Sequence, residues 1–293
     1  RSGWGRWSVR RPRTARNLTV QRSMTAHRPH IFGIVNITED SFSDGGQFLS
    51  PETAIAHAAD LLAAGADVLD IGPASSHPDA RDVSADEEIE RLSAIWPDLR
   101  AMGCALSVDS FQPKTQKWAL AQDADWLNDI NGFRDPQMQE LLADSSCSLV
   151  VMHAIQAKGI ATRAAPPNGD IWEHILAFFE ARLEALTRAG VDPSRCVLDP
   201  GMGFFLGNRP ETSWVVLRHI NRLKKAFDLP VLLSVSRKSF LRALVDCPTD
   251  AAGPASLSAE LFAARQQVDC IRTHDVGQLD QALKVARHLD SFL

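Results

Sequence analysis

Polar side chains that could bind a ligand stand at the ends of short apolar runs along the chain. Asp109, Asn128 and Asp199 lie at the ends of three such runs, and Arg272 and His274 end another near the C-terminus. Carboxylate and amide groups suit the donor- and acceptor-rich edge of a flat heterocycle. Core-facing strand positions normally hold apolar residues, because a buried polar group is costly unless it is paired or used. We therefore expect these residues to share one binding site.

A second set of residues supplies positive charge. Arg237 and Lys238 follow the apolar run 229–233 in the stretch SVSRKSF, and Arg272 and His274 close the next run. Barrel folds commonly hold phosphate at their last two strands, and such cations would bind it. We therefore expect an anion to bind beside the heterocycle. A salt bridge within the barrel is the alternative explanation for Arg272.

The elements that must position these residues are short, β-branched runs that alternate with longer helical patterns, as in repeated strand–helix units. Eight such units favour an α/β fold of the single-domain (β/α)8 TIM barrel type over a doubly wound sheet, which usually has fewer strands. The chemistry of such a barrel lies at the carboxyl ends of its strands. The predicted strands are 31–37, 67–71, 104–109, 126–130, 148–153, 195–199, 230–235 and 269–274.

Some polar residues and loops have more than one explanation. Asp70 and Asp129 lie on predicted strands, but each could equally be a cap or turn residue. The loops at 38–46 and 72–79 are small and polar, and we expect both to close over a substrate. The connection 154–170 is long and contains a Pro-Pro-Asn-Gly sequence, which predicts a mobile lid.

Residues 1–29 differ in composition from the rest. The first 23 residues hold seven arginines and no acid. There are three explanations for this stretch: a transit-like peptide, a nucleic-acid-binding arm, or an upstream stretch included by an over-extended reading frame. We favour the last explanation, in which Met24 is the true start. We expect residues 1–29 to be a basic extension that is disordered or not native, and residues 30–293 to form the barrel domain.

Composition limits the class of protein. The chain has 293 residues, 45% hydrophobic and 23% charged, as in a soluble globular protein. It has no apolar run long enough to span a membrane, and no basic stripe continues into the acidic body, so we expect neither a membrane nor a nucleic-acid partner. The five cysteines are odd in number and have no metal-like spacing, which indicates free thiols in a reducing, cytoplasmic compartment.

A series of motifs makes the chain similar to the dihydropteroate synthases from Ile31 to about Leu289. The resemblance implies a magnesium-dependent transferase of folate biosynthesis that is usually a homodimer. Its substrates would be 6-hydroxymethyl-7,8-dihydropterin pyrophosphate and p-aminobenzoate, and its products 7,8-dihydropteroate and pyrophosphate. The motifs, in chain order, are GIVNITEDSFSDGG, GADVLDIGPASSHPDA, SVDS, LNDI, VVMH, LDPGMGF, SRKSF and IRTHD.

The resemblance also implies roles for individual residues and makes residues 30–293 a pterin-binding barrel. The metal-linked position is Asn36, whose neutral oxygen suits Mg²⁺ carried in largely by substrate phosphates. The catalytic residues are Asp109, Asn128, Asp199 and Lys238, which also bind the pterin together with Met152 and Phe204. The pyrophosphate side comprises Ser76, His77, Arg272 and His274, and the p-aminobenzoate side comprises Ser75, Pro78, Phe205, Ser236 and Ser239.

At three places the sequence departs from the housekeeping members of this family. At these places it resembles the family's mobile, sulfonamide-insensitive members. His77 stands where an arginine usually helps to hold pyrophosphate, the stretch 203–207 is bulkier than usual, and Ser234 replaces a common glycine. Our hypothesis is that bulk around Phe205 and Ser234 admits p-aminobenzoate but excludes sulfonamides, whose sulfonyl group projects further. The alternative is that Phe204 and Phe205 merely pack the rim.

Three other functions compete with a sulfonamide-insensitive synthase. The first is a sulfonamide-sensitive housekeeping synthase. A pterin-binding methyltransferase module shares the barrel and the Asp-Asn-Asp pocket, but a methylated folate needs no pyrophosphate-binding SRKS and RTH motifs. A degenerate barrel that only binds pterin is disfavoured, because the predicted catalytic residues are all present.

Overall fold

The structure, a computed structural model, describes residues 28–38 and 50–290. Their strands form one parallel sheet in the order β6-β5-β4-β3-β2-β1-β8-β7. A parallel bridge between Leu198 and Val231 joins the two end strands, so the sheet closes into a (β/α)8 barrel as predicted. The strands are β1 (His30–Asn36), β2 (Val68–Gly72), β3 (Ala105–Asp109), β4 (Trp126–Asp129), β5 (Ser148–Met152), β6 (Cys196–Asp199), β7 (Leu232–Leu233) and β8 (Cys270–Thr273).

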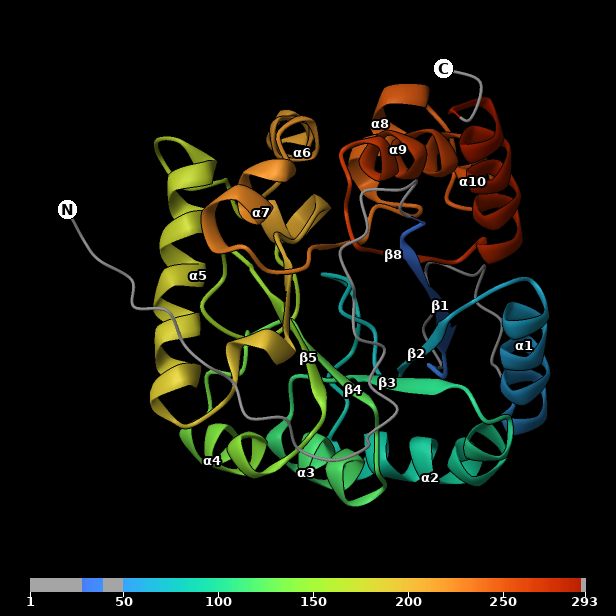
Figure 1. Cartoon of the computed structure of the whole chain (residues 1–293), viewed down its shortest axis with the longest axis vertical. Coiled ribbons are helices and arrows are strands. Elements are labelled where there is room, and N and C mark those ends of the chain that lie inside the picture. The colour runs from blue at the N-terminus through green and yellow to red at the C-terminus, as the bar shows by residue number, and fades with distance from the viewer. Residues whose placement is uncertain (1–27, 39–49, 291–293) are drawn as a thin grey trace.

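The helices form a ring around these strands (Figure 1). Two short 3-10 turns, η1 (Pro193–Arg195) and η2 (Gly203–Leu206), flank β6. The α-helices of the described residues are α1 (Pro51–Ala63), α2 (Ala85–Ala101), α3 (Pro113–Ala121), α4 (Pro136–Asp144), α5 (Ile171–Arg188), α6 (Pro210–Arg218), α7 (Asn221–Phe227), α8 (Ser239–Val245), α9 (Gly253–Arg265) and α10 (Val276–Asp290).

The helices begin and end where the sequence signals them. Ser50 accepts a hydrogen bond from the Thr53 N–H, with proline in the first turn of α1, and Ser84 accepts one from Glu87 at the start of α2. Gly65 and Gly190 follow α1 and α5 with φ of 107° and 98°, a backbone conformation that favours glycine.

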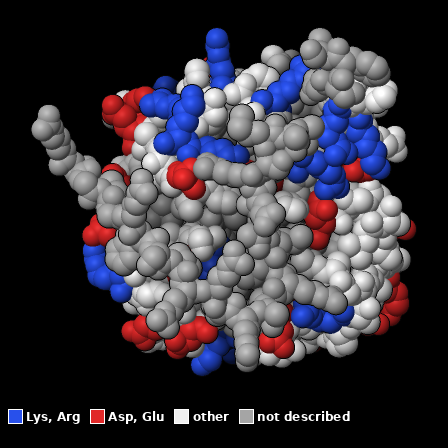
Figure 2. Space-filling model, in the orientation of Figure 1, with Lys and Arg blue, Asp and Glu red and all other residues white. Residues whose placement is uncertain are grey.

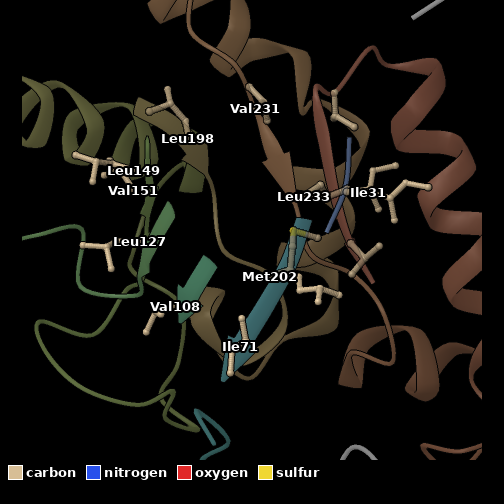
Figure 3. Close-up of a cluster of buried hydrophobic side chains, with 14 of the residues drawn as sticks. Ile31, Ile71, Val108, Leu127, Leu149, Val151, Leu198, Met202, Val231 and Leu233 are labelled. Carbon is tan, nitrogen blue, oxygen red and sulfur yellow. The ribbon is translucent and has the colours of Figure 1, made fainter. Parts of the chain in front are cut away.

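Each strand has one face toward the helices and one toward the barrel axis, because side chains alternate along a strand. The main core cluster packs outward-facing strand residues against the helices, and Figure 3 shows Ile71, Val108, Leu127 and Leu149 among them. A second cluster fills the floor of the barrel. It comprises Phe32, Val68, Trp126, Val150, Val197, Leu232 and Cys270.

All eight predicted strands are present, and the largest difference is in β7. The prediction was 230–235, but ladder pairing is limited to Leu232 and Leu233. Pro230 has no N–H to donate, and the Val231 N–H donates to the Asp269 carboxylate at 2.9 Å instead of to a neighbouring strand. Beyond Ser234 the chain leaves the sheet in the turn that carries Arg237, whose φ is 57°.

Two predictions fall on residues that the structure does not describe. Residues 1–27 of the predicted extension and residues 39–49 of the first loop lie outside the described ranges, so both predictions remain open. The described chain starts at Arg28, which donates to Asp67 at 2.5 Å and to the Gly65 carbonyl at 2.9 Å.

Three further features of the described residues concern membrane-spanning helices, cysteines and surface charge. Helices long and apolar enough to cross a membrane are absent from the described residues. The five cysteines are free thiols. On the face viewed in Figure 2, Lys and Arg side chains are interspersed with Asp and Glu around the periphery.

Candidate active site

A cavity of about 410 Å³ opens at the carboxyl ends of the strands. We call it the outer compartment. It leads to a smaller inner compartment at the barrel axis, and Asp109, Lys238 and Arg272 line both. Every predicted site residue lines one compartment or the other. The inner one adds Asn128, Met152 and Asp199, and the outer one holds Asn36, Ser75, Ser76, His77, Pro78, Phe204, Phe205, Ser236, Ser239 and His274.

The strand register brings the polar residues together above the apolar floor. Asp109 is the register partner of Asn128, and Met152 is the partner of Asp199. Asp70 stands two residues beyond Val68 on the same face of β2, and Arg272 stands two beyond Cys270 on β8. The layer over the floor therefore holds Asp70, Asn128, Asp199 and Arg272 beside the apolar Met152.

Arg272 binds two carboxylates, the buried one of Asp70 and the partly buried one of Asp109. Its Nε donates to Asp70, and its Nη2 donates to Asp109 Oδ2 at 2.8 Å. The salt bridge that the sequence left as an alternative for Arg272 is thus formed in this structure. It also gives the buried Asp70 a role in holding Arg272, where the sequence had allowed a capping role.

Three buried polar atoms of this layer have no hydrogen-bond partner among the described residues. They are Asp70 Oδ1, Ser107 Oγ and Asn128 Oδ1. Buried polar atoms are almost always hydrogen-bonded in folded proteins, so a cluster without partners indicates a place for a polar ligand. Of these three residues Asn128 lines the inner compartment, so its side-chain oxygen is placed to accept an N–H group of a ligand.

Burial moves the pKa values of the two acidic strand-end residues upward. The pKa of Asp109 is raised to about 7, mainly by burial and against the opposing effect of Arg272. The pKa of Asp199 is raised to about 6 by burial, although its carboxylate accepts the Gly201 N–H at 2.8 Å and lies near Lys238. Both groups can change charge near neutral pH.

Lys238 lies at the start of α8, between the two compartments. Burial and the nearby Arg272 lower the pKa of Lys238 to about 8, although Asp199 and Asp109 oppose this shift. The Nζ atom lies 5.3 Å from the ring centroid of Phe205, within the range of a cation–π contact. Phe205 thus forms a wall beside this ammonium group.

The segments that follow β7 and β8 add a group of polar residues at the mouth. His274 Nδ1 lies 2.9 Å from Ser236 Oγ, and Arg237 pairs with Asp275 at 3.2 Å. Burial, with the cations Arg237 and Arg272, lowers the pKa of His274 well below its usual value. The neutral imidazole can then donate or accept a hydrogen bond without carrying charge.

The predicted lid lies against the second loop. The Ala161 N–H donates to the Ser76 carbonyl at 3.1 Å, and both terminal nitrogens of Arg163 donate to the Asp79 carboxylate. Arg163 also lies over the ring of Phe204 at 5.6 Å. The connection 154–170 therefore covers one side of the outer compartment.

His77 packs against Phe204 at the wall of the outer compartment. Its ring and that of Phe204 meet edge to face, with centroids 6.0 Å apart. Burial is the main cause that lowers the pKa of His77, and the cations Arg163, Arg242 and Lys238 add to it, against Asp79. A neutral histidine thus stands in a surrounding that already holds several cations.

Sequence reasoning missed several residues of this region. Arg163 comes from a loop without a motif, so nothing in its surroundings could have assigned it. Arg242 lies four residues after Lys238, on α8, and helical spacing after the SRKS motif could have placed it beside the site. Asp129, by contrast, is a turn residue, because it accepts the N–H groups of Asn131 at 2.7 Å and Phe133 at 2.9 Å.

Asn36 and Thr38 are the oxygen-bearing residues at the mouth beside β1. Clusters of three or more His, Cys, Asp or Glu that could hold a metal ion are absent from the described residues. The buried Thr38 Oγ1 has no partner in the part of the chain described. Such a sparse set of neutral oxygens fits Mg²⁺ only if a phosphate ligand supplies the remaining coordination.

Comparisons with known proteins agree with this geometry. Residues 32–274 match the family described as pterin binding enzyme. The dihydropteroate synthase type-2 of Escherichia coli is 56% identical over 255 residues, which are 87% of this chain and 94% of the relative.

Two solved structures have the same fold. Xanthomonas albilineans dihydropteroate synthase with 4-aminobenzoic acid is 34% identical, has a TM-score of 0.81, and is matched over 90% of this chain and 93% of its own. Yersinia pestis dihydropteroate synthase with a sulfonamide drug complex is 31% identical, has a TM-score of 0.85, and is matched over 96% of this chain and 99% of its own.

Proposed function

Because this chain belongs to the pterin-binding enzyme family, as a dihydropteroate synthase of folate biosynthesis, we propose that its two compartments divide the two substrates. The inner compartment binds the pterin of 6-hydroxymethyl-7,8-dihydropterin pyrophosphate, and the outer one binds p-aminobenzoate and the pyrophosphate. The observation that carries this assignment is that Asp109, Asn128 and Asp199 line the inner compartment, with an unpartnered oxygen on Asn128, while several cations line the outer one.

The inner compartment has the donors and acceptors that a pterin needs. Asp109 and Asp199 accept N–H groups of the heterocycle, and Asn128 can both donate and accept. Met152 and Phe205 belong to one apolar cluster beside this layer and supply flat contact surface for the ring. The ionised carboxylates also stabilise positive charge that develops on the pterin when pyrophosphate departs.

The pyrophosphate leaving group is anionic, and one cation with two neutral polar side chains at the mouth stabilises its departure. Lys238 lies nearest the reacting bond, and His274 and Asn36 reach the pyrophosphate from β8 and β1. Mg²⁺, carried in by the phosphates, would neutralise part of their charge. The resemblance implied that Arg272 binds pyrophosphate, but two carboxylates already hold its guanidinium. We therefore assign Arg272 the role of keeping Asp109 ionised and in place.

Bond formation needs no covalent nucleophile from the protein. The carbon–oxygen bond to pyrophosphate breaks, and the amine of p-aminobenzoate forms the new carbon–nitrogen bond and loses a proton. The protein's contribution is to hold the amine in line with the departing group and to exclude water.

Release of pyrophosphate with p-aminobenzoate present is the test of this function. The enzyme should form dihydropteroate and pyrophosphate in equal amounts, and chelation of Mg²⁺ should reduce the rate. Asp199→Asn should retain the fold and lose most turnover. Methyl transfer from a methylated folate, with no pyrophosphate formed, would support the methyltransferase alternative instead.

We also propose that the enzyme is insensitive to sulfonamides because of η2. Phe204 faces His77 and Arg163 at the outer compartment, and Phe205 lies against Lys238, so the two rings narrow the passage between the compartments. A planar carboxylate passes this wall more easily than a tetrahedral sulfonyl group with its substituent. Phe205→Gly should make sulfamethoxazole a stronger inhibitor.

We further propose that the chain forms a homodimer through α8 and α9. Exposed apolar side chains gather there, including Leu244, Val245 and Phe262, and a groove between α6, α8 and α9 is lined mainly by apolar residues. Surfaces of this kind usually mark an interface. Light scattering should give the mass of two chains, and Leu244→Glu with Phe262→Glu should give the mass of one.

A further inference from the structure

Arg242 lines the outer compartment from α8 and has no ionic partner in the described structure. Its guanidinium makes no side-chain hydrogen bond or ion pair with a described residue, and its buried Nε has no partner. Other arginines of this region differ. Arg163 is held by Asp79, Arg237 by Asp275, and Arg272 by Asp70 and Asp109.

An arginine without a partner in a partly enclosed cavity is poorly satisfied. The guanidinium has five N–H donors and no acceptor, and it stays protonated at any physiological pH. Burial of a charged group is costly unless an opposite charge joins it. Other cations stand close by, because Arg163, Arg242 and Lys238 each lower the pKa of His77. This side of the outer compartment therefore has a surplus of positive charge and suits an anionic ligand.

The substrates offer two anionic groups, and the position of Arg242 favours one of them. Lys238 and Arg242 are four residues apart on α8, so about one helical turn of 5.4 Å separates them. Lys238 reaches the inner compartment, whereas Arg242 lines only the outer one. Asn36 and His274, which we assign to pyrophosphate, come from β1 and the end of β8 instead.

We propose that Arg242 binds the carboxylate of p-aminobenzoate and makes the enzyme select substrates that carry it. This inference rests on the proposed function. The amine of p-aminobenzoate must point to the reacting carbon near Lys238, so the carboxylate at the opposite end of the ring points outward along α8. The planar guanidinium matches a carboxylate through two parallel N–H···O bonds. A neutral amide at the same position offers one acceptor and no charge.

The test compares p-aminobenzoate with the neutral analogue p-aminobenzamide in three variants. Arg242→Gln should raise KM for p-aminobenzoate about tenfold, the effect of losing a charge-assisted hydrogen bond. The preference for p-aminobenzoate over p-aminobenzamide, as a ratio of kcat/KM, should fall by a similar factor. KM for the pterin pyrophosphate should stay within about twofold, because Arg242 does not reach the inner compartment. Arg242→Lys, which keeps the charge, should lie between, and Arg265→Gln, an exposed arginine of α9 outside both compartments, should match the unchanged enzyme.

Several results would overturn the inference. An unchanged KM for p-aminobenzoate would do so, as would a parallel rise in KM for the pterin pyrophosphate, which would assign Arg242 to the leaving group. If thermal melting shows that Arg242→Gln does not fold, Arg242→Lys decides, because its preference for the carboxylate must still fall. Failure of the proposed function itself looks different, since the unchanged enzyme would then form no dihydropteroate.

Discussion

At the scale of single residues, three ionisable side chains of the inner compartment are moved toward neutral pH. Burial raises the pKa of Asp109 to about 7 and that of Asp199 to about 6, and it lowers the pKa of Lys238 to about 8. Such shifts are common where a site must hold charge without water. The charged forms of all three coexist only in a narrow range of pH.

We expect this coexistence to give a bell-shaped pH profile of kcat/KM for the pterin pyrophosphate. The rate constant should rise between about pH 6 and 7 as the two carboxylic acids lose protons, and it should fall above about pH 8 as the Lys238 ammonium becomes neutral. Lys238→Arg should extend the plateau to higher pH, because arginine stays protonated. The assignment is wrong if the fall above pH 8 is unchanged in that variant.

Arg272 is the residue whose loss should destabilise the fold most directly. Arg272→Met leaves the buried Asp70 and the partly buried Asp109 without their cation, which should lower the free energy of unfolding by about 3–5 kcal/mol in urea titrations. The loss should be smaller at pH 6 than at pH 8, because the carboxyl group of Asp109 can then take up a proton.

A surface arginine serves as the control for this experiment. Arg188 pairs with Glu184 on the exposed face of α5, so Arg188→Met should cost no more than about 1 kcal/mol. Equal losses in the two variants would show that the pair of buried carboxylates does not depend on Arg272.

At the scale of elements, the turn after β6 fixes the position of Asp199. Gly201 has a φ of 69°, and a Cβ atom there would lie 2.3 Å from the His153 carbonyl oxygen at the end of β5. Its N–H also donates to the Asp199 carboxylate. Glycine is therefore required for both backbone conformation and space.

This requirement can be separated into its two parts with a second glycine. Gly103 has a similar φ of 72°, but a Cβ atom there would meet nothing within 4 Å. Gly103→Ala should cost about 1–2 kcal/mol of unfolding free energy from the backbone conformation alone. Gly201→Ala should cost clearly more in the same urea titration and should also impair pterin binding. Equal costs would show that β5 shifts freely to make room.

At the scale of the whole molecule, the sequence predicted the barrel and the location of the site but not its internal pairing. Short apolar runs between helical patterns located every strand, and the carboxyl-end rule placed Asp109, Asn128 and Asp199 in one mouth. Arg272 pairs with Asp70 across 202 residues and with Asp109 across 163, and Arg163 pairs with Asp79 across 84. Pairing at such separations depends on barrel closure and on side-chain reach, which no local pattern specifies.

The rate of dihydropteroate formation across a sulfamethoxazole titration tests the central claim most directly. The intact chain, supplied with Mg²⁺, the pterin pyrophosphate and p-aminobenzoate, should form dihydropteroate at a rate that the drug scarcely changes. Turnover abolished by submicromolar drug would contradict the role given to Phe204 and Phe205. Absence of dihydropteroate at every drug concentration, including none, would contradict the synthase itself.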